Sequence, residues 1–275
     1  MGEGRIMSLD FVQISLLAIL QGITEFLPIS SSGHLILPSI LLDWDDQGLI
    51  FDVAVHIGTL IALLLYFRSD IRELFGAWIS SLGPKGQTEN STLAWYLIVA
   101  TIPAGVVGLL LNDWVEQYAR SLPTIAATSI IFAALLYWSD HSSKKNLSLR
   151  DLTWRTVTFI GFAQALALIP GTSRSGITMT AALLCDLNRE SAARFSFLLA
   201  VPIIVATGLL KSIELVNSPQ GSIQLLSLTY AITLSAVVAW TCIHFFLQLI
   251  TRIGFLPFVI YRVILGLLLL LVYFS

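Results

Sequence analysis

Long apolar stretches separated by short polar segments run through most of the chain. Six of them carry few charges, at residues 50–67, 93–111, 122–138, 192–210, 223–250 and 255–274. A helix needs roughly 20 apolar residues to cross the hydrocarbon of a membrane. The pattern therefore predicts an all-α integral membrane protein with about six transmembrane helices.

Two further apolar segments, residues 9–42 and 157–186, are interrupted by proline, glycine and serine. Non-helical backbone at membrane depth is tolerated only where it is buried in protein or lines a cavity. We therefore expect both segments to form re-entrant helical hairpins rather than simple transmembrane helices.

The composition agrees with a membrane protein. Of the 275 residues, 56% are hydrophobic and 12% are charged, whereas soluble domains carry about 25% charged residues. The net charge of −2 and the absence of a basic run give no sign of a nucleic-acid partner. Cys185 and Cys242 lie in apolar sequence without metal-binding spacing, so we expect packed thiols rather than a disulfide. No cleavable signal peptide is expected, because the first apolar run leads directly into a polar motif.

The two broken segments resemble each other. At an offset of 143 residues Gln21 matches Gln164, Ser30 matches Ser173, Ser32 matches Ser175 and Gly33 matches Gly176, and Pro28 matches Pro170 at an offset of 142. This similarity predicts one transmembrane domain over residues 1–275. It would be built from a first repeat of about 1–140 and a second of about 150–275, joined by the basic loop 139–155.

Basic residues divide unequally between alternate loops. Loops 68–90, 139–155, 187–191 and 251–254 contain nine Lys and Arg residues, and the N-terminal tail with loops 43–49, 112–121 and 211–222 contains three. The positive-inside bias places the first group in the cytoplasm. This division of the loops requires each hairpin to leave the membrane on the side from which it entered. The first hairpin would enter from outside and the second from inside. The chain is thus expected to be an inverted-topology repeat with a site near the midplane.

The first hairpin motif, residues 21–34, reads QGITEFLPISSSGH and contains a carboxylate at membrane depth. Such groups are costly there and usually serve a pathway or a reaction. Gln21 and Glu25 are four residues apart and share a helical face. With substrate phosphate oxygens they could hold Mg²⁺ or Ca²⁺. The alternative is a hydrogen-bonded pair that only braces the hairpin.

Hydroxyls and an imidazole follow in the same motif. Ser30, Ser31, Ser32 and Gly33 precede a resumed helix, and backbone N–H groups at a helix start bind anions. His34 could attack phosphorus or transfer a proton, with Ser31 as the alternative nucleophile and metal-bound water as a third. We lean towards His34, since histidine cycles its proton near neutral pH. At least one serine is expected to serve as a helix N-cap.

The second hairpin motif, residues 170–176, reads PGTSRSG. Its Arg174 can grip a phosphate with two parallel hydrogen bonds. Further donors and space for the phosphate are expected from the neighbouring residues Gly171, Thr172, Ser173, Ser175 and Gly176. Alternatively, Arg174 forms a purely structural pair with Glu25.

Other intramembrane polar residues indicate less. His56 and Asp52 could either support the first hairpin or hold helices together, and both readings stay open. We expect Arg194 and Arg262 to be structural, paired with acids or reaching towards the membrane surface.

Residues 21–34 and 170–176 closely resemble the two signature motifs of the bacitracin-resistance type undecaprenyl pyrophosphate phosphatases. The resemblance extends over essentially the whole chain. It implies a multi-pass enzyme of the bacterial cytoplasmic membrane, open to the outer face, that converts undecaprenyl pyrophosphate to undecaprenyl phosphate. This product is the lipid carrier for peptidoglycan and other envelope polymers.

The resemblance also implies a divalent-metal requirement and roles for individual residues. It places Gln21 and Glu25 at the metal, Ser31 and His34 at the reaction centre, and Ser173 and Arg174 on the pyrophosphate. Many members have Glu where this chain has Gln21, which puts a two-carboxylate metal site in doubt. The oligomeric state stays open, with a homodimer as one alternative.

A lipid transporter is the second candidate function, because transporters share inverted repeats and broken helices. A transporter needs only binding groups, whereas a hydrolase also needs a nucleophile and charge stabilisation. His34, Ser31, Glu25 and Arg174 supply these groups, so hydrolysis is the favoured prediction.

Overall fold

The computed structural model describes residues 9–42, 44–84, 86–217 and 225–275. The helices run in the order α1 (Phe11–Thr24), α2 (Ser31–Leu41), α3 (Gly48–Tyr66), α4 (Arg68–Ser81), α5 (Glu89–Tyr118), α6 (Leu122–Ser142), η1 (Leu149–Asp151), α7 (Trp154–Ala165), η2 (Leu166–Leu168), α8 (Arg174–Leu184), α9 (Arg189–Asn217), α10 (Leu225–Ile253) and α11 (Leu256–Phe274). Within these ranges, β structure is limited to an isolated bridge between Leu147 and Leu187. The all-α prediction is confirmed.

Six of the described helices are long and apolar enough to cross a membrane: Gly48–Tyr66, Glu89–Leu111, Leu122–Ser142, Arg189–Lys211, Leu225–Ile253 and Leu256–Phe274. They coincide with the six apolar stretches, so the predicted number of spans is confirmed. The two interrupted segments instead form the helix pairs α1–α2 and α7–α8, and in each pair the two helices pack against one another.

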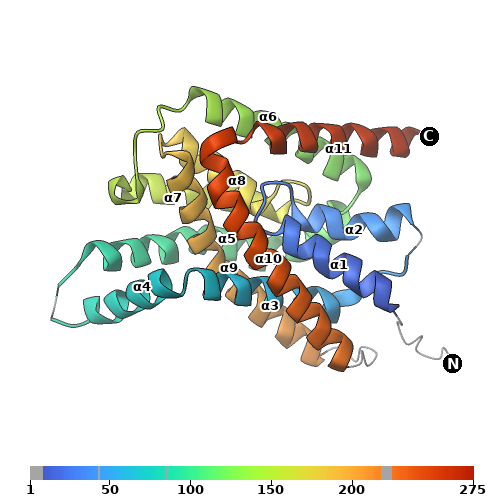
Figure 1. The fold of residues 1–275 in the computed structure, drawn as a ribbon, viewed down its shortest axis with the longest axis horizontal. Coiled ribbons are helices and arrows are strands. Elements are labelled where there is room, and N and C mark those ends of the chain that lie inside the picture. Colours follow the sequence, from blue (N-terminus) through green and yellow to red (C-terminus); the bar gives the residue numbers. More distant parts are fainter. Residues whose placement is uncertain (1–8, 43, 85, 218–224) are drawn as a thin grey trace.

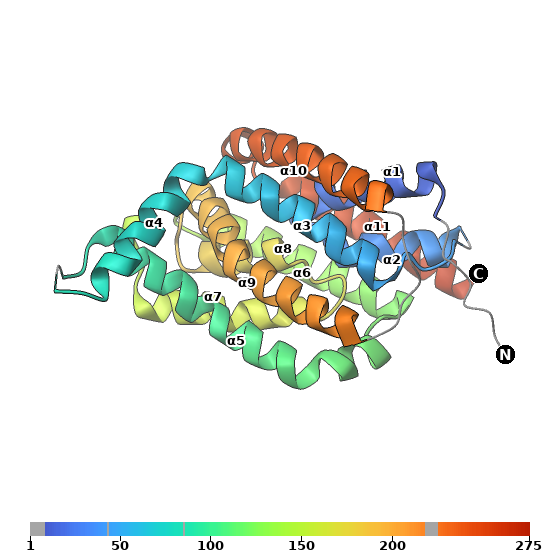
Figure 2. The same cartoon turned by 90° about the horizontal axis from the view of Figure 1, so that it is seen from below.

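The helices form one bundle in which chain-distant elements lie side by side. α11 lies along α6 at one edge, while α10 crosses α3 (Figure 1). Helix α8 is buried along most of its length, whereas α1 and α2 lie at the side of the bundle towards the C-terminus (Figures 1 and 2). The C-terminus lies at the end of the molecule opposite α4, as Figure 2 also shows.

Glycines allow the closest helix crossings. A Cβ added at Gly161 of α7 would lie 2.8 Å from the Ala100 carbonyl oxygen of α5. A Cβ at Gly58 of α3 would collide with Ser235 and Ile232 of α10. Small residues at such crossings let helix backbones approach in membrane proteins. The first helix of each hairpin packs on a long helix of the other proposed repeat: α1 packs on α10, and α7 packs on α5. This reciprocal packing supports the inverted repeat, which stays a prediction.

Partly exposed ion pairs join the basic segments at one end of the bundle. Asp140 at the end of α6 accepts bonds from Arg189 Nε at 2.7 Å and Nη2 at 2.9 Å, and lies 3.4 Å from Lys145 Nζ. Arg194 of α9 donates to Asp70 at 2.7 Å. Arg194 is therefore structural, as expected, and the segments that follow α3, α6 and α8 meet at the same end.

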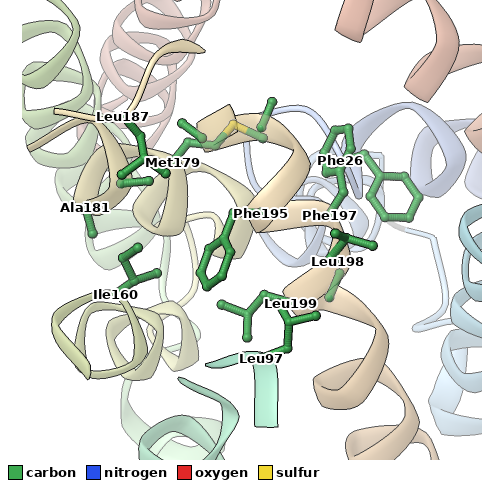
Figure 3. Packing of buried hydrophobic residues seen from close by; sticks show 14 of the residues in the cluster. Phe26, Leu97, Ile160, Met179, Ala181, Leu187, Phe195, Phe197, Leu198 and Leu199 are labelled. Carbon is green, nitrogen blue, oxygen red and sulfur yellow. The ribbon is translucent and has the colours of Figure 1, made fainter. Parts of the chain in front are cut away.

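The apolar core anchors the first hairpin to α9. Phe26, which follows Glu25, is fully buried, and its ring meets that of Phe197 edge-on with centroids 5.4 Å apart. Figure 3 shows these rings in one cluster with Phe195, Leu198 and Leu199 of α9 and with Met179 of α8. The core thus fixes the position of the first hairpin relative to the second.

Candidate functional site

The turns of the two hairpins share one backbone geometry. Ser30 and Ser173, each the residue before its helix, have φ values of 76° and 71°. Their hydroxyls accept from the N–H groups of Gly33 at 3.3 Å and Gly176 at 3.1 Å. Positive φ is uncommon in residues other than glycine, and such strain tends to occur at functional sites. The N-cap role expected for a serine is confirmed for Ser30, and Ser173 repeats it.

A side-chain contact joins the two turns directly. Ser175 Oγ donates to the Leu27 carbonyl oxygen at 2.8 Å and lies 3.1 Å from Ser173 Oγ. In the first hairpin, Ser30 Oγ and Ser32 Oγ are 3.4 Å apart. The serine-rich motifs therefore form one continuous polar region, although the contacting residues Leu27 and Ser175 are 148 positions apart in sequence.

Glu25 lies at the centre of this region. Its Oε1 accepts from Arg174 Nη2 at 2.7 Å, while its Oε2 accepts from Ser31 Oγ at 2.7 Å and Gln21 Nε2 at 3.0 Å. His56 Nε2 lies 3.7 Å from the same Oε2 atom. The other end of the guanidinium, Arg174 Nη1, donates to the Ser196 carbonyl oxygen at 3.4 Å. One carboxylate thus connects both hairpins with α3.

These groups open into a cavity of about 550 Å³. Its polar end is formed by Glu25, Arg174, His56 and the serines of both turns. Most of the remaining wall consists of apolar and small residues of α5, η2 and α9, including Ala104, Gly105, Gly108, Leu109, Leu168, Ile203, Ile204 and Leu210, and the polar residues Gln164, Thr207 and Lys211 also line it. A charged group and a long apolar group could therefore be accommodated together.

The sequence candidates separate into two sets. Six of them line the cavity: Glu25, Ser30, Ser31, Ser32, Ser173 and Arg174. The others lie behind this lining: Gln21, Gly33, His34, Gly171, Thr172, Ser175 and Gly176. Gly171, with φ of +87°, packs its turn against Ile125 and Thr128 of α6. In this structure the glycine gives the turn room beside a helix.

His34 is buried, and both of its ring nitrogens have protein partners. Nδ1 lies 2.7 Å from the Ser30 carbonyl oxygen, which can only accept, so Nδ1 carries the proton. Nε2 then accepts from the hydroxyl of Tyr261 at 2.6 Å. The ring also stacks on Tyr261 with centroids 5.6 Å apart. In this arrangement His34 braces the Ser30 turn against α11, and its direct participation in a reaction stays a prediction.

His56 and Gln164 are cavity residues that sequence reasoning did not assign to the site. His56 Nδ1 donates to the Asp52 carbonyl oxygen at 2.7 Å, which leaves Nε2 on the side of Glu25. Gln164 is bound through Nε2 to the Ala100 carbonyl oxygen at 3.2 Å. Two features of the sequence could have identified them as site residues. His56 is a polar side chain within an apolar span, and Gln164 matches Gln21 in the first hairpin.

Unsatisfied polar atoms concentrate at this site. Among the described residues, four buried side-chain atoms have no hydrogen-bond partner, namely Gln21 Oε1, Gln164 Oε1, Thr172 Oγ1 and Trp78 Nε1. Three of the four belong to the interrupted segments 9–42 and 157–186. Because buried polar atoms in folded proteins are nearly always paired with protein or ordered water, these atoms leave hydrogen-bonding capacity at the site for water or a polar ligand.

The arrangement has the elements of phosphoryl transfer. Ser31 is a hydroxyl already hydrogen-bonded to a carboxylate base, and Arg174 and Gln21 orient that base. Arg174 and the first turns of α2 and α8 provide positive charge and N–H groups for phosphate oxygens. The fold and this site define a helical membrane protein in which two hairpins bring an arginine, a carboxylate and several hydroxyls together at one cavity.

Comparison with known proteins agrees with this class. Residues 14–268 match the family described as bacitracin resistance protein BacA, and the chain belongs to that family. It is 52% identical over 258 residues to undecaprenyl-diphosphatase 1 of Pseudoalteromonas translucida (strain TAC 125), covering 94% of this chain and 97% of the relative. It is 53% identical over 261 residues to the undecaprenyl-diphosphatase of Teredinibacter turnerae (strain ATCC 39867 / T7901), covering 95% and 98%. The family resemblance predicted from the two motifs is confirmed.

Proposed function

We propose that the protein is an undecaprenyl-diphosphatase, which releases inorganic phosphate from undecaprenyl pyrophosphate and leaves undecaprenyl phosphate. This activity recycles the lipid carrier for cell-envelope synthesis and confers bacitracin resistance. The observation that carries the proposal is the meeting of Arg174, Glu25 and Ser31 at the polar end of a largely apolar cavity. The names of the relatives support the same activity.

The contacts suggest how the chain performs this hydrolysis. Arg174 and the helix starts hold the pyrophosphate and stabilise charge on the transferred phosphoryl group. Ser31 Oγ attacks the terminal phosphorus while Glu25 accepts its proton, and the bond to the bridging oxygen breaks with release of undecaprenyl phosphate. Water then hydrolyses the phosphoserine. The alternatives to attack by Ser31 are attack on the phosphorus by His34 or by an activated water.

A divalent cation, Mg²⁺ or Ca²⁺, completes the proposal. Gln21 Oε1 is a buried acceptor without a partner, next to Glu25, the one acidic side chain among the described residues that line the cavity. No group of three or more His, Cys, Asp or Glu residues in the described ranges could hold a metal by itself. These residues fit an ion that takes part of its ligands from the substrate. Glu25 and Gln21 would hold it, and it would neutralise pyrophosphate charge.

Phosphate release by the purified protein in detergent tests the function. We expect stoichiometric inorganic phosphate from undecaprenyl pyrophosphate, loss of that activity in excess EDTA, and recovery with Mg²⁺ or Ca²⁺. Flipping of a fluorescent polyprenyl pyrophosphate between the leaflets of proteoliposomes, without phosphate release, would instead establish the lipid transporter. Full hydrolysis in excess chelator would remove the cation from the proposal while leaving the activity in place.

We propose that the site opens to the outer face of the bacterial inner membrane. The gathering of basic segments near Asp140 supports a cytoplasmic location for that end. In a background without Cys185 and Cys242, cysteine at the exposed position Asp45 should react with an impermeant thiol reagent added to spheroplasts. Cysteine at the exposed position Lys144 should react only after permeabilisation. The reverse labelling pattern would overturn the orientation. Gln220, an equivalent outer position by sequence, lies outside the described residues.

A further inference from the structure

A buried arginine in the last helix contacts neither a carboxylate nor the cavity. Arg262 of α11 is 1% exposed and lies within the span Leu256–Phe274. None of the ion pairs found among the described residues includes Arg262. Burying a charge is costly unless its hydrogen-bonding capacity is used. The placement of this guanidinium therefore needs a role that outweighs its cost.

Backbone carbonyl oxygens take the place of an acid. All five acceptors of Arg262 are main-chain oxygens: Pro28 at 3.2 Å, Gly171 at 2.8 Å, Thr172 at 3.0 Å, Ser129 at 3.2 Å and Thr128 at 3.4 Å. They come from the first hairpin turn, the second hairpin turn and α6. One guanidinium thus connects three segments that are far apart in sequence.

The contacted carbonyls lie next to the residues that line the cavity. Pro28 comes two residues before Ser30, and the Thr172 carbonyl belongs to the same rigid peptide plane as the Ser173 N–H. Gly176 leaves room for the guanidinium, because a Cβ there would lie 2.9 Å from Arg262 Nη1. A shift of Arg262 would consequently shift both serine turns.

We propose that Arg262 is a positioning residue that locks the two hairpin turns together and so sets the geometry of Ser31, Glu25 and Arg174. This inference rests on the proposed phosphatase function. Arg262 touches no cavity atom, so its effect passes through the backbone of the turns. A planar fork with five N–H donors suits several carbonyls at once, which a lysine ammonium does not.

Phosphate release by Arg262→Lys and Arg262→Gln tests the proposal, with Arg194→Lys as the matched control. Arg194 is also an intramembrane arginine, but it pairs with Asp70 away from the cavity. We expect kcat to fall at least about 100-fold in both Arg262 variants with KM changed much less, since misplacing reacting groups by about 1 Å has that effect. Arg194→Lys should stay within about threefold of wild type.

Two further measurements separate positioning from folding. In Arg262→Gly, added guanidinium should restore part of kcat, whereas equal ammonium should not. Gly176→Ala, which keeps Arg262 but crowds its Nη1, should lower kcat in a protein that still elutes as a single detergent-solubilised species. Near-normal kcat in the Lys and Gln variants, or equal rescue by both cations, would overturn the proposal. If wild type releases no phosphate, the phosphatase function itself fails.

Discussion

Glu25→Gln should reduce phosphate release by at least about 1,000-fold, equivalent to ~4 kcal/mol of transition-state stabilisation. The amide keeps the size of the side chain but removes the charge that pairs with Arg174 and the base that accepts from Ser31. It also removes the one acidic side chain among the described residues that line the cavity. The measurement is the initial rate of phosphate release at saturating substrate. Activity within tenfold of wild type would contradict the central position of Glu25.

The same substitution should lower stability. It leaves Arg174, whose side chain is 14% exposed, without its acidic partner, and breaking one side of a buried pair costs about 3–5 kcal/mol. Asp70→Asn is the control, because it breaks a comparable arginine pair whose side chains are 33% and 35% exposed. That partly exposed pair should contribute less than about 1 kcal/mol. Thermal unfolding in detergent would distinguish the two variants.

Ser31→Ala should abolish turnover, and wild type should accumulate a phosphoserine in rapid-quench experiments with substrate labelled in the terminal phosphate. The reason is the 2.7 Å hydrogen bond from Ser31 Oγ to Glu25, which prepares this hydroxyl for attack. A phosphoserine survives acid, whereas a phosphohistidine survives alkali and is lost in acid. Both stability tests on the quenched protein therefore decide between Ser31 and His34.

Ser32→Ala provides the matched control for Ser31. Ser32 also lines the cavity, but its hydroxyl makes a long contact of 3.4 Å with Ser30 Oγ. Losing one such bond should slow turnover by about tenfold or less. An acid-labile adduct that persists in Ser31→Ala would favour His34 as the nucleophile. No adduct in either residue would favour direct attack by water.

The apolar pattern was enough to predict the spans and the two interrupted segments. Long runs such as 93–111 and 122–138 contain no charged residue, and membrane hydrocarbon imposes a helix on them. The helix breaks at Pro28 and Pro170 could also be predicted from the sequence, because the backbone constraints of proline and glycine disfavour a continuous helix. Helix α4 was not predicted as a separate element, since its 14 residues are too short and polar for a span.

The site was predictable as a set of residue types but not as a set of contacts. The sequence identified Glu25, Ser31 and Arg174 as candidates because polar and charged side chains are energetically costly at membrane depth. It could not show that His34 faces Tyr261 while His56 faces Glu25, since both histidines lie on apolar helices. That distinction depends on the rotation and crossing of α3 and α11, which are set by contacts across the whole bundle. For the same reason Arg262 was expected to pair with an acid or reach the surface, whereas it binds carbonyls.

The positive φ angles of Ser30 and Ser173 lower the stability of the hairpin turns, although the side chains of these serines are needed there. Each such residue carries a backbone cost of about 1–3 kcal/mol that glycine would avoid. Glycine, however, would remove the side chain whose hydroxyl caps the following helix and which also lines the cavity. These two positions are therefore poor targets for thermostabilisation, even though conformational reasoning alone would select them first.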